Sequence, residues 1–227
     1  MRIGFLLYDN LTQLDMTGPA QVLSRMPGAQ VDYVAKTLEP VMSDCRLALM
    51  PTVTLSEAGQ FDLLCVPGGY GCSAVMNDEM VLDWLRAQAS GLSWLTSVCT
   101  GSLILAAAGL LRGRNAACHW AWGHYLPLFG AKFQAQRTVF DGNIITAGGV
   151  TSGIDFAFQV LEHLHGADVA ATIRLALEYD PLAVAGGSPD SARPEIVDAV
   201  QALTTTRLGH RDAEMRIAAA RLNGERS

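Results

Sequence analysis

The chain has 227 residues, of which 50% are hydrophobic and 17% charged, and its formal net charge is -6. This composition predicts a folded protein with a sizeable core and excludes a disordered chain. Because no run of basic residues offsets the acidic balance, we expect no nucleic-acid partner.

Short apolar segments alternate with amphipathic helical segments along the chain, which predicts an open, mostly parallel sheet covered by helices on both faces. The predicted strands are residues 2–8, 30–36, 62–66 and 93–98, a hairpin or edge excursion at 40–56, and a hairpin of 133–140 with 143–147 around an Asp-Gly turn. After a loop at 9–18, Thr17 is expected to cap the first helix, with Pro19 in its first turn. The other predicted helices are 78–90, 103–111, 154–165, 167–179, 194–206 and 209–222.

Three turns that contain glycine follow predicted strands directly, at 67–71, 99–102 and 148–150. In an open α/β sheet, ligands bind beyond the carboxyl ends of the strands. The loop that carries Asp15 leaves the first strand at the same edge. We therefore expect these four segments to meet in one crevice.

Cys99 lies where a buried strand turns into a helix, so the amide groups and dipole of that helix favour a reactive thiolate over a packed thiol. The other four cysteines are interpreted as packed thiols. Their spacing includes no Cys-x-x-Cys pair and no Cys/His cluster, so we expect no disulfide framework, no metal site and no cofactor.

Four motifs together resemble the ThiJ/PfpI superfamily. They are L-D-M-T-G-P at 14–19, P-G-G-Y-G at 67–71, S-V-C-T-G-S at 97–102 and G-G-V-T-S-G-I-D at 148–155. The resemblance covers about residues 1–180 and implies a flavodoxin-like fold, a cysteine at a nucleophile elbow and a homodimer. Residues 181–227 then form a C-terminal extension of a loop and helices, whose apolar positions Val200 and Leu203 pack on this domain or on a dimer partner.

Within this superfamily the chain is most similar to isocyanide hydratases, because Asp15 stands where many relatives have glutamate and Thr100 follows the cysteine in place of histidine. The resemblance implies a lyase that converts an organic isocyanide and water to an N-substituted formamide through a cysteine thioimidate. Cys99 is then the nucleophile and Asp15 the proton-transfer group. Thr100 hydrogen-bonds Asp15 or the sulfur.

Four further residues are assigned to substrate or oxyanion binding: Gly69, Gly149, Val150 and His119. The amide of Gly69 is expected to stabilise developing charge. His119 could instead be a structural residue that lines the pocket, and Asp15 could instead cap a helix. We interpret the remaining histidines, His210 among them, as surface or helix residues.

Two other classes of function stay open at this stage. One is a glyoxalase-like or deglycase-like cysteine enzyme with a carboxylate base. The other is a redox or ligand sensor without enzymatic activity, since an exposed thiol of low pKa is readily oxidised. No secretory leader is evident, and the apolar stretch at 102–111 is far shorter than the roughly 20 residues that span a bilayer. We therefore expect a cytoplasmic protein without membrane contact.

Overall fold

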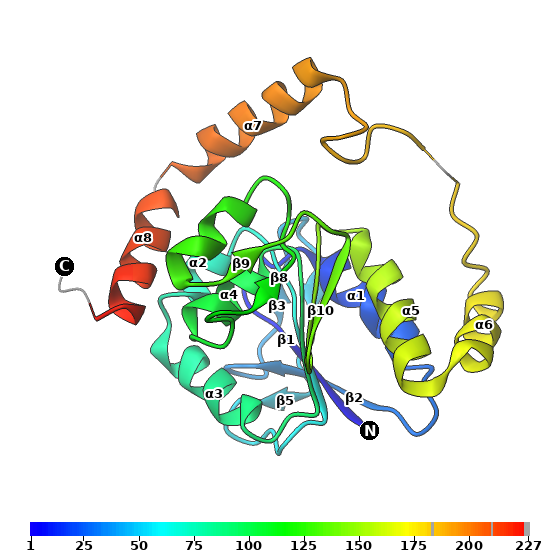
Figure 1. Ribbon diagram of the computed structural model, residues 1–227. Helices are drawn as coiled ribbons and strands as arrows, with labels where there is room; N and C mark the ends of the chain where they lie inside the picture. Colours follow the sequence, from blue (N-terminus) through cyan, green and yellow to red (C-terminus); the bar gives the residue numbers. More distant parts are fainter. Residues whose placement is uncertain (183, 210, 225–227) are drawn as a thin grey trace.

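The computed structural model describes residues 1–182, 184–209 and 211–224, so His210 lies outside the described residues (Figure 1). A seven-stranded sheet in the order β10-β11-β7-β6-β1-β2-β5 forms its centre. All neighbouring strands run parallel except β10 and β11, which form the predicted antiparallel hairpin. The strands of this sheet are β1 (Arg2–Leu6), β2 (Gln30–Ala35), β5 (Val53–Thr54), β6 (Leu63–Val66), β7 (Trp94–Val98), β10 (Thr138–Asp141) and β11 (Ile144–Ala147).

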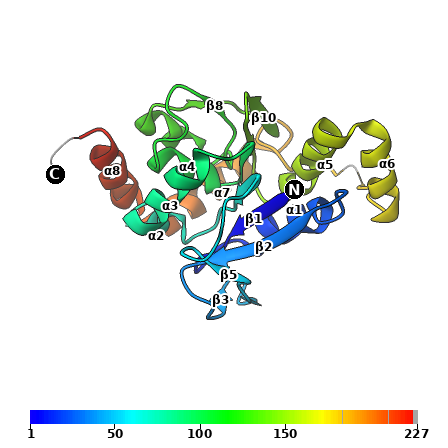
Figure 2. The same cartoon turned by 90° about the horizontal axis from the view of Figure 1, so that it is seen from below.

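Helices cover both faces of the sheet, as the alternating pattern predicts (Figures 1 and 2). One face carries α1 (Gln13–Leu23), α5 (Ser152–His165) and α6 (Ala167–Ala176). The other carries α2 (Cys72–Val75), α3 (Glu79–Ala89), α4 (Gly101–Ala107) and the 3-10 helix η1 (Gly123–Phe129). Because both faces are covered, every residue of β6 and of β11 is buried.

Two small strand pairs lie outside the main sheet. The segment predicted as a hairpin or edge excursion contributes β3 (Val41–Met42) and β4 (Ala48–Leu49), which pair antiparallel, and its last part forms β5 at the sheet edge. The second pair is parallel and consists of β8 (Asn115–Ala116) and β9 (Lys132–Phe133). The β3–β4 hairpin brings residues 43–47 beside the loop that follows β1, where Asp44 N–H donates to the carbonyl of Leu11.

The start predicted for the first helix is wrong. Helix α1 begins at Gln13, so Thr17 and Pro19 lie inside it and Asp15 is in its first turn. Thr12 is the N-terminal flanking residue, but its hydroxyl does not cap the helix and donates to Asp44 Oδ2 at 2.6 Å. The local cap signal is absent because this hydroxyl is used in a contact with a distant segment.

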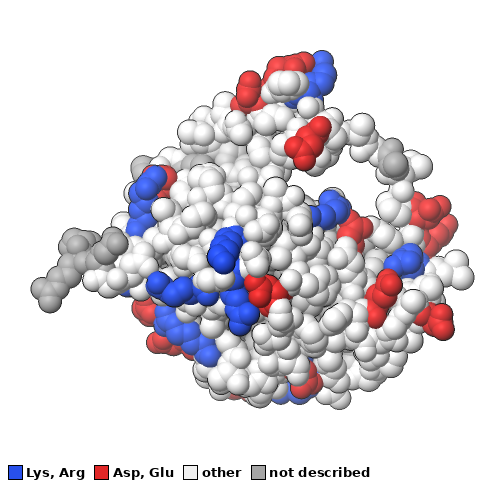
Figure 3. Space-filling model, viewed as in Figure 1, with Lys and Arg blue, Asp and Glu red and all other residues white. Residues whose placement is uncertain are grey.

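The C-terminal segment forms the two predicted helices, α7 (Pro194–Leu208) and α8 (Arg211–Leu222). From the end of α6 this segment arches over the carboxyl ends of the strands and returns to the body at α8 (Figure 1). Figure 3, viewed as in Figure 1, shows an opening between the arch and the body, beside the segment that leads from α6 into α7. None of the described helices is both long and apolar enough to cross a membrane.

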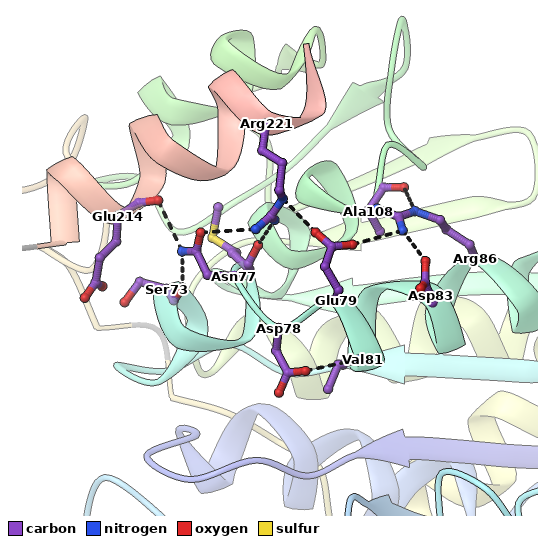
Figure 4. A network of polar contacts seen from close by, with 11 residues as sticks. Ser73, Asn77, Asp78, Glu79, Val81, Asp83, Arg86, Ala108, Glu214 and Arg221 are labelled. Atoms are coloured by element: carbon purple, nitrogen blue, oxygen red, sulfur yellow. Dashed lines mark hydrogen bonds and ion pairs between the residues drawn. The ribbon is translucent and has the colours of Figure 1, made fainter. Parts of the chain in front are cut away.

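Helix α8 is fastened to α2 and α3 by a polar network (Figure 4). Arg221 donates to the carbonyl of Met76 at 2.6 Å and pairs with Glu79 at 2.7 Å. Asn77 donates its side-chain amide to the carbonyl of Glu214 at 3.2 Å. Met215 is fully buried in the same interface. Helix α8 is therefore anchored, and α7 is held between this anchor and α6.

Candidate active site

Cys99 forms the sharp turn between β7 and α4, as the motif predicts. Its φ of 60° lies in the left-handed region, which a non-glycine residue adopts only where the surroundings impose it. The surroundings here are main-chain contacts, since Cys99 N–H donates to the carbonyls of Ala147 and Gly148 at 3.1 and 2.9 Å. Gly101 lets α4 approach β6 closely, because an added Cβ would lie 2.0 Å from the carbonyl oxygen of Val66. The side chain of Cys99 thus projects from a rigid turn.

Cys99 is only 5% exposed, and the pKa of its thiol lies well above the ordinary value. Burial is the largest cause, and the negative charge of Asp15 adds to it. The amides of Val150 and Thr100 hydrogen-bond the sulfur and lower the pKa, but burial outweighs them. The expectation of a thiolate in the resting site is therefore wrong: the resting group is a thiol with two donors placed to receive negative charge on sulfur.

Asp15 is completely buried, and burial raises the pKa of its carboxyl from 3.8 to about 7. Two hydrogen bonds oppose this shift, one from Gly68 N–H to Oδ2 at 3.0 Å and one with the thiol of Cys99. Oδ1 is buried and has no well-formed hydrogen bond to a described residue. The carboxyl does not cap α1, because its main-chain partner belongs to another segment. It therefore faces the reactive sulfur near its own midpoint of titration at neutral pH.

Thr100 contributes its amide to Cys99, whereas its hydroxyl is used elsewhere. The hydroxyl accepts from Gly69 N–H at 3.0 Å, and it also hydrogen-bonds the thiol of Cys72. Its expected bond to Asp15 or to the Cys99 sulfur is not among the contacts of the described residues. The Gly69 amide, expected to stabilise developing charge, is therefore already bonded to Thr100, and the amides that face the sulfur are those of Thr100 and Val150.

His119 packs beside the third glycine-containing turn. Its Nδ1 accepts from Ala121 N–H at 3.3 Å, and burial lowers its pKa, so the imidazole is neutral with its proton on Nε2. Gly149 provides the space for this ring, because an added Cβ would lie 2.5 Å from His119 Cδ2. Val150 follows, with a φ of 26°. The sequence pattern thus places Gly149 against the histidine and Val150 against the cysteine.

A cavity of about 300 Å³ opens above Cys99. Five of the predicted site residues line it: Gly69, Cys99, Thr100, His119 and Val150. Asp15 lies beneath the cavity, against the sulfur of Cys99. The expected meeting of the three glycine-containing turns with the Asp15 segment is confirmed. Sequence reasoning missed seven lining residues, which are Thr12, Asp44, Tyr70, Trp122, Val200, Leu203 and Thr204.

Local signals could have found some of the missed residues and not others. Tyr70 belongs to the P-G-G-Y-G turn, and Trp122 lies three positions after His119. Asp44 comes from the β3–β4 hairpin, and Val200 comes from α7, far from any of the four motifs. Only the three-dimensional fold brings these two segments to the cavity.

Comparison with known proteins agrees with this geometry. Residues 1–163 match the family model described as the DJ-1/PfpI family. The chain is 46% identical over 224 residues to isonitrile hydratase of Pseudomonas putida, and the match covers 98% of each chain. It is 28% identical to the glutathione-independent glyoxalase DJR-1.2 of Caenorhabditis elegans over 61% of this chain and 75% of that one.

A solved structure is similar along nearly the whole chain. It is a ThiJ/PfpI family protein from Pseudomonas syringae, with a TM-score of 0.90 and 35% sequence identity, and the match covers 96% of this chain and 90% of that one. The flavodoxin-like arrangement and the superfamily resemblance of the motifs are both confirmed by these matches. The chain belongs to the DJ-1/PfpI family.

Proposed function

We propose that this protein is an isocyanide hydratase, a lyase that adds water to an organic isocyanide and releases the N-substituted formamide. The observation that carries the proposal is the 46% identity to an isonitrile hydratase over 98% of both chains. The similarity to a glyoxalase is weaker and spans only 61% of this chain. In keeping with the family resemblance, we expect a cytoplasmic homodimer.

The first chemical step joins the thiol to the isocyanide. The Asp15 carboxylate accepts the proton of Cys99 Sγ while the sulfur attacks the terminal carbon of R–NC. Asp15 then donates that proton to the same carbon, which gives the thioimidate R–N=CH–S–Cys99. A carboxyl with a pKa of about 7 suits both transfers, because neither protonation state is strongly disfavoured at neutral pH.

Water releases the product in the second step. It adds to the thioimidate carbon, one of its protons passes through Asp15 to the nitrogen, and the other returns to sulfur as the C–S bond breaks. The products are R–NH–CHO and the Cys99 thiol. The two steps together therefore convert R–NC and H₂O to R–NH–CHO. Oδ1 of Asp15, which is buried and has no well-formed hydrogen bond to a described residue, is the acceptor that this water requires.

Main-chain donors support the charge that develops in both steps. Negative charge on sulfur is stabilised by the amides of Thr100 and Val150, which already hydrogen-bond the sulfur. The Thr100 hydroxyl accepts from Gly69 N–H at 3.0 Å. This bond holds the Gly69 turn beside the cysteine and keeps the floor of the cavity in place. His119, neutral and protonated on Nε2, supplies a hydrogen-bond donor at the cavity wall.

The proposal is tested by incubating the protein with cyclohexyl isocyanide and following the formamide by mass spectrometry. We expect turnover by the natural sequence and none by Cys99→Ala. Cys65→Ala is the matched control, because Cys65 is also buried but lies within β6, outside the cavity. It should retain activity.

Three outcomes would contradict the proposal. Turnover that persists in Cys99→Ala would remove the covalent mechanism. Hydration of no isocyanide, together with conversion of methylglyoxal to lactate, would favour the glyoxalase alternative, and rapid peroxide oxidation of Cys99 without any turnover would favour a sensor.

A further inference from the structure

The cavity above Cys99 has a roof that does not come from the part of the chain matched by the family model. That model ends at residue 163, whereas Val200, Leu203 and Thr204 of α7 line the cavity. The isonitrile hydratase relative aligns over 98% of this chain and therefore shares most of this later segment. The residues that close the cavity thus belong to the part of the chain that the hydratase relative has in addition to the family core.

The roof faces the 119–122 segment of the body. Ile196, Val197 and Val200 line a second hollow together with Trp120, so the inner face of α7 lies opposite this tryptophan. The roof is not tightly packed, because Leu203 is 57% exposed even though it lines the cavity. A side chain of this kind gains apolar contact when a ligand fills the space beneath it.

The geometry of an isocyanide directs its substituent toward this roof. The R–N–C unit is linear, so when the terminal carbon lies at the Cys99 sulfur, the R group must point away from the floor. Among the residues that line the cavity, Trp122, Val150, Val200 and Leu203 offer apolar surface to this group, alongside polar residues such as Asp44 and Thr204. Each apolar group that the substituent desolvates favours binding by the area it buries.

We propose that Val200, Leu203 and Thr204 select the R group, and that the preferred substrates are isocyanides with a neutral, bulky alkyl or aryl substituent. The proposal rests on the hydratase function proposed above and assigns its substrate preference to α7. Small isocyanides such as methyl isocyanide react at the same sulfur without reaching the roof. Selectivity for bulk is therefore separable from the chemistry at Cys99.

The test compares kcat/KM for cyclohexyl isocyanide with kcat/KM for methyl isocyanide. We expect Leu203→Ala to lower the ratio of the two values about tenfold, the effect of removing a few methylene contacts from an apolar pocket. The value for methyl isocyanide should fall by a smaller factor than the value for cyclohexyl isocyanide. Val200→Ala should act in the same direction.

Leu175→Ala is the matched control, because Leu175 is 83% exposed on α6 and does not line the cavity. It should leave the ratio unchanged, and the melting temperature of each variant shows whether folding is intact. An unchanged ratio in both α7 variants, with both isocyanides hydrated, overturns the proposal. Absence of turnover with either isocyanide in the natural sequence contradicts the hydratase function instead, so the two failures are distinguishable.

Discussion

At the scale of single residues, the chemistry depends on one buried carboxyl group. Asp15 is completely buried, and its pKa rises from 3.8 to about 7 mainly because of that burial. If the carboxylate accepts the thiol proton of Cys99, kcat/KM should be low in acid, rise through about pH 7 and level off above it. The high pKa of Cys99 means that loss of its proton does not remove activity in that range. A pH profile of kcat/KM measures this, and a profile that is flat from pH 5 to 8 would contradict it.

The same shift has a consequence for stability, which gives a control independent of activity. The carboxyl is easier to ionise in the unfolded chain, so the folded state loses stability as pH rises from about 4 to about 7 and then stays level. A shift of about three units corresponds to roughly 4 kcal/mol, at 1.36 kcal/mol per unit. Asp15→Asn removes the proton-transfer group, so its rate should be lower by a factor of about 10²–10⁴. In denaturant unfolding at pH 8 it should be more stable than the natural sequence, with the difference vanishing near pH 4.

At the scale of secondary-structure elements, the elbow depends on close contact between α4 and β6. An added Cβ at Gly101 would lie 2.0 Å from the carbonyl of Val66 and 2.9 Å from that of Pro67, and neither main-chain atom can move aside easily. Gly101→Ala should cost about 3 kcal/mol and lower the melting temperature by roughly 10 °C. Differential scanning calorimetry measures this.

Gly187→Ala provides the matched control for this element. An added Cβ at Gly187 meets nothing within 4 Å, so its melting temperature should change little. Equal melting temperatures for Gly101→Ala and the natural sequence would show that the α4–β6 contact relaxes at little cost. Any effect of the substitution on the position of Cys99 would then be measured by kcat, not by stability.

Strands and turns were predictable at this scale because their signals are local. β6 and β7 are short apolar runs that end at glycine-containing turns, and their lengths alone distinguish them from helices. The start of α1 was not predictable, because the Thr12 hydroxyl bonds Asp44 and does not act as a cap. The ionisation of Cys99 was misjudged for a related reason. Helix-end amides can be read from sequence, whereas the burial that outweighs them depends on the packed fold.

At the scale of the whole molecule, part of the missed cavity lining comes from segments that only the fold brings together. The hairpin residue Asp44 and the α7 residues Leu203 and Thr204 are distant in sequence from the four motifs. The helical pattern marks Leu203 as an apolar packing position, but it does not place that position at the cavity. Their convergence follows from the arch of the C-terminal segment over the strand ends (Figure 1). That arch is held at α8 through Arg221 and at α6.

This arrangement predicts how the protein responds to limited proteolysis. Residues 177–182 and 184–193 lie between α6 and α7, and Leu182 is 89% exposed, so cleavage by chymotrypsin should begin there. The nicked protein should stay together under native conditions, because Arg221 and the buried Met215 hold α8 on the body. In Arg221→Ala the C-terminal fragment should separate on gel filtration after the same cut.

Arg193→Ala is the control for this experiment, since Arg193 pairs with its neighbour Glu195 at 3.2 Å and both side chains are more than half exposed. Such a pair adds little stability, so the nicked control should remain associated. Retention of the fragment in Arg221→Ala would mean that apolar contacts alone hold α8. First cleavage inside α3 or α5 would mean that the arch is bound more tightly than the body it covers. Helix α7 lies between the cut and the anchor, so it is lost with the fragment. Loss of the fragment should therefore also abolish the preference for cyclohexyl over methyl isocyanide. The selectivity of the site would then depend on the fold of the C-terminal segment.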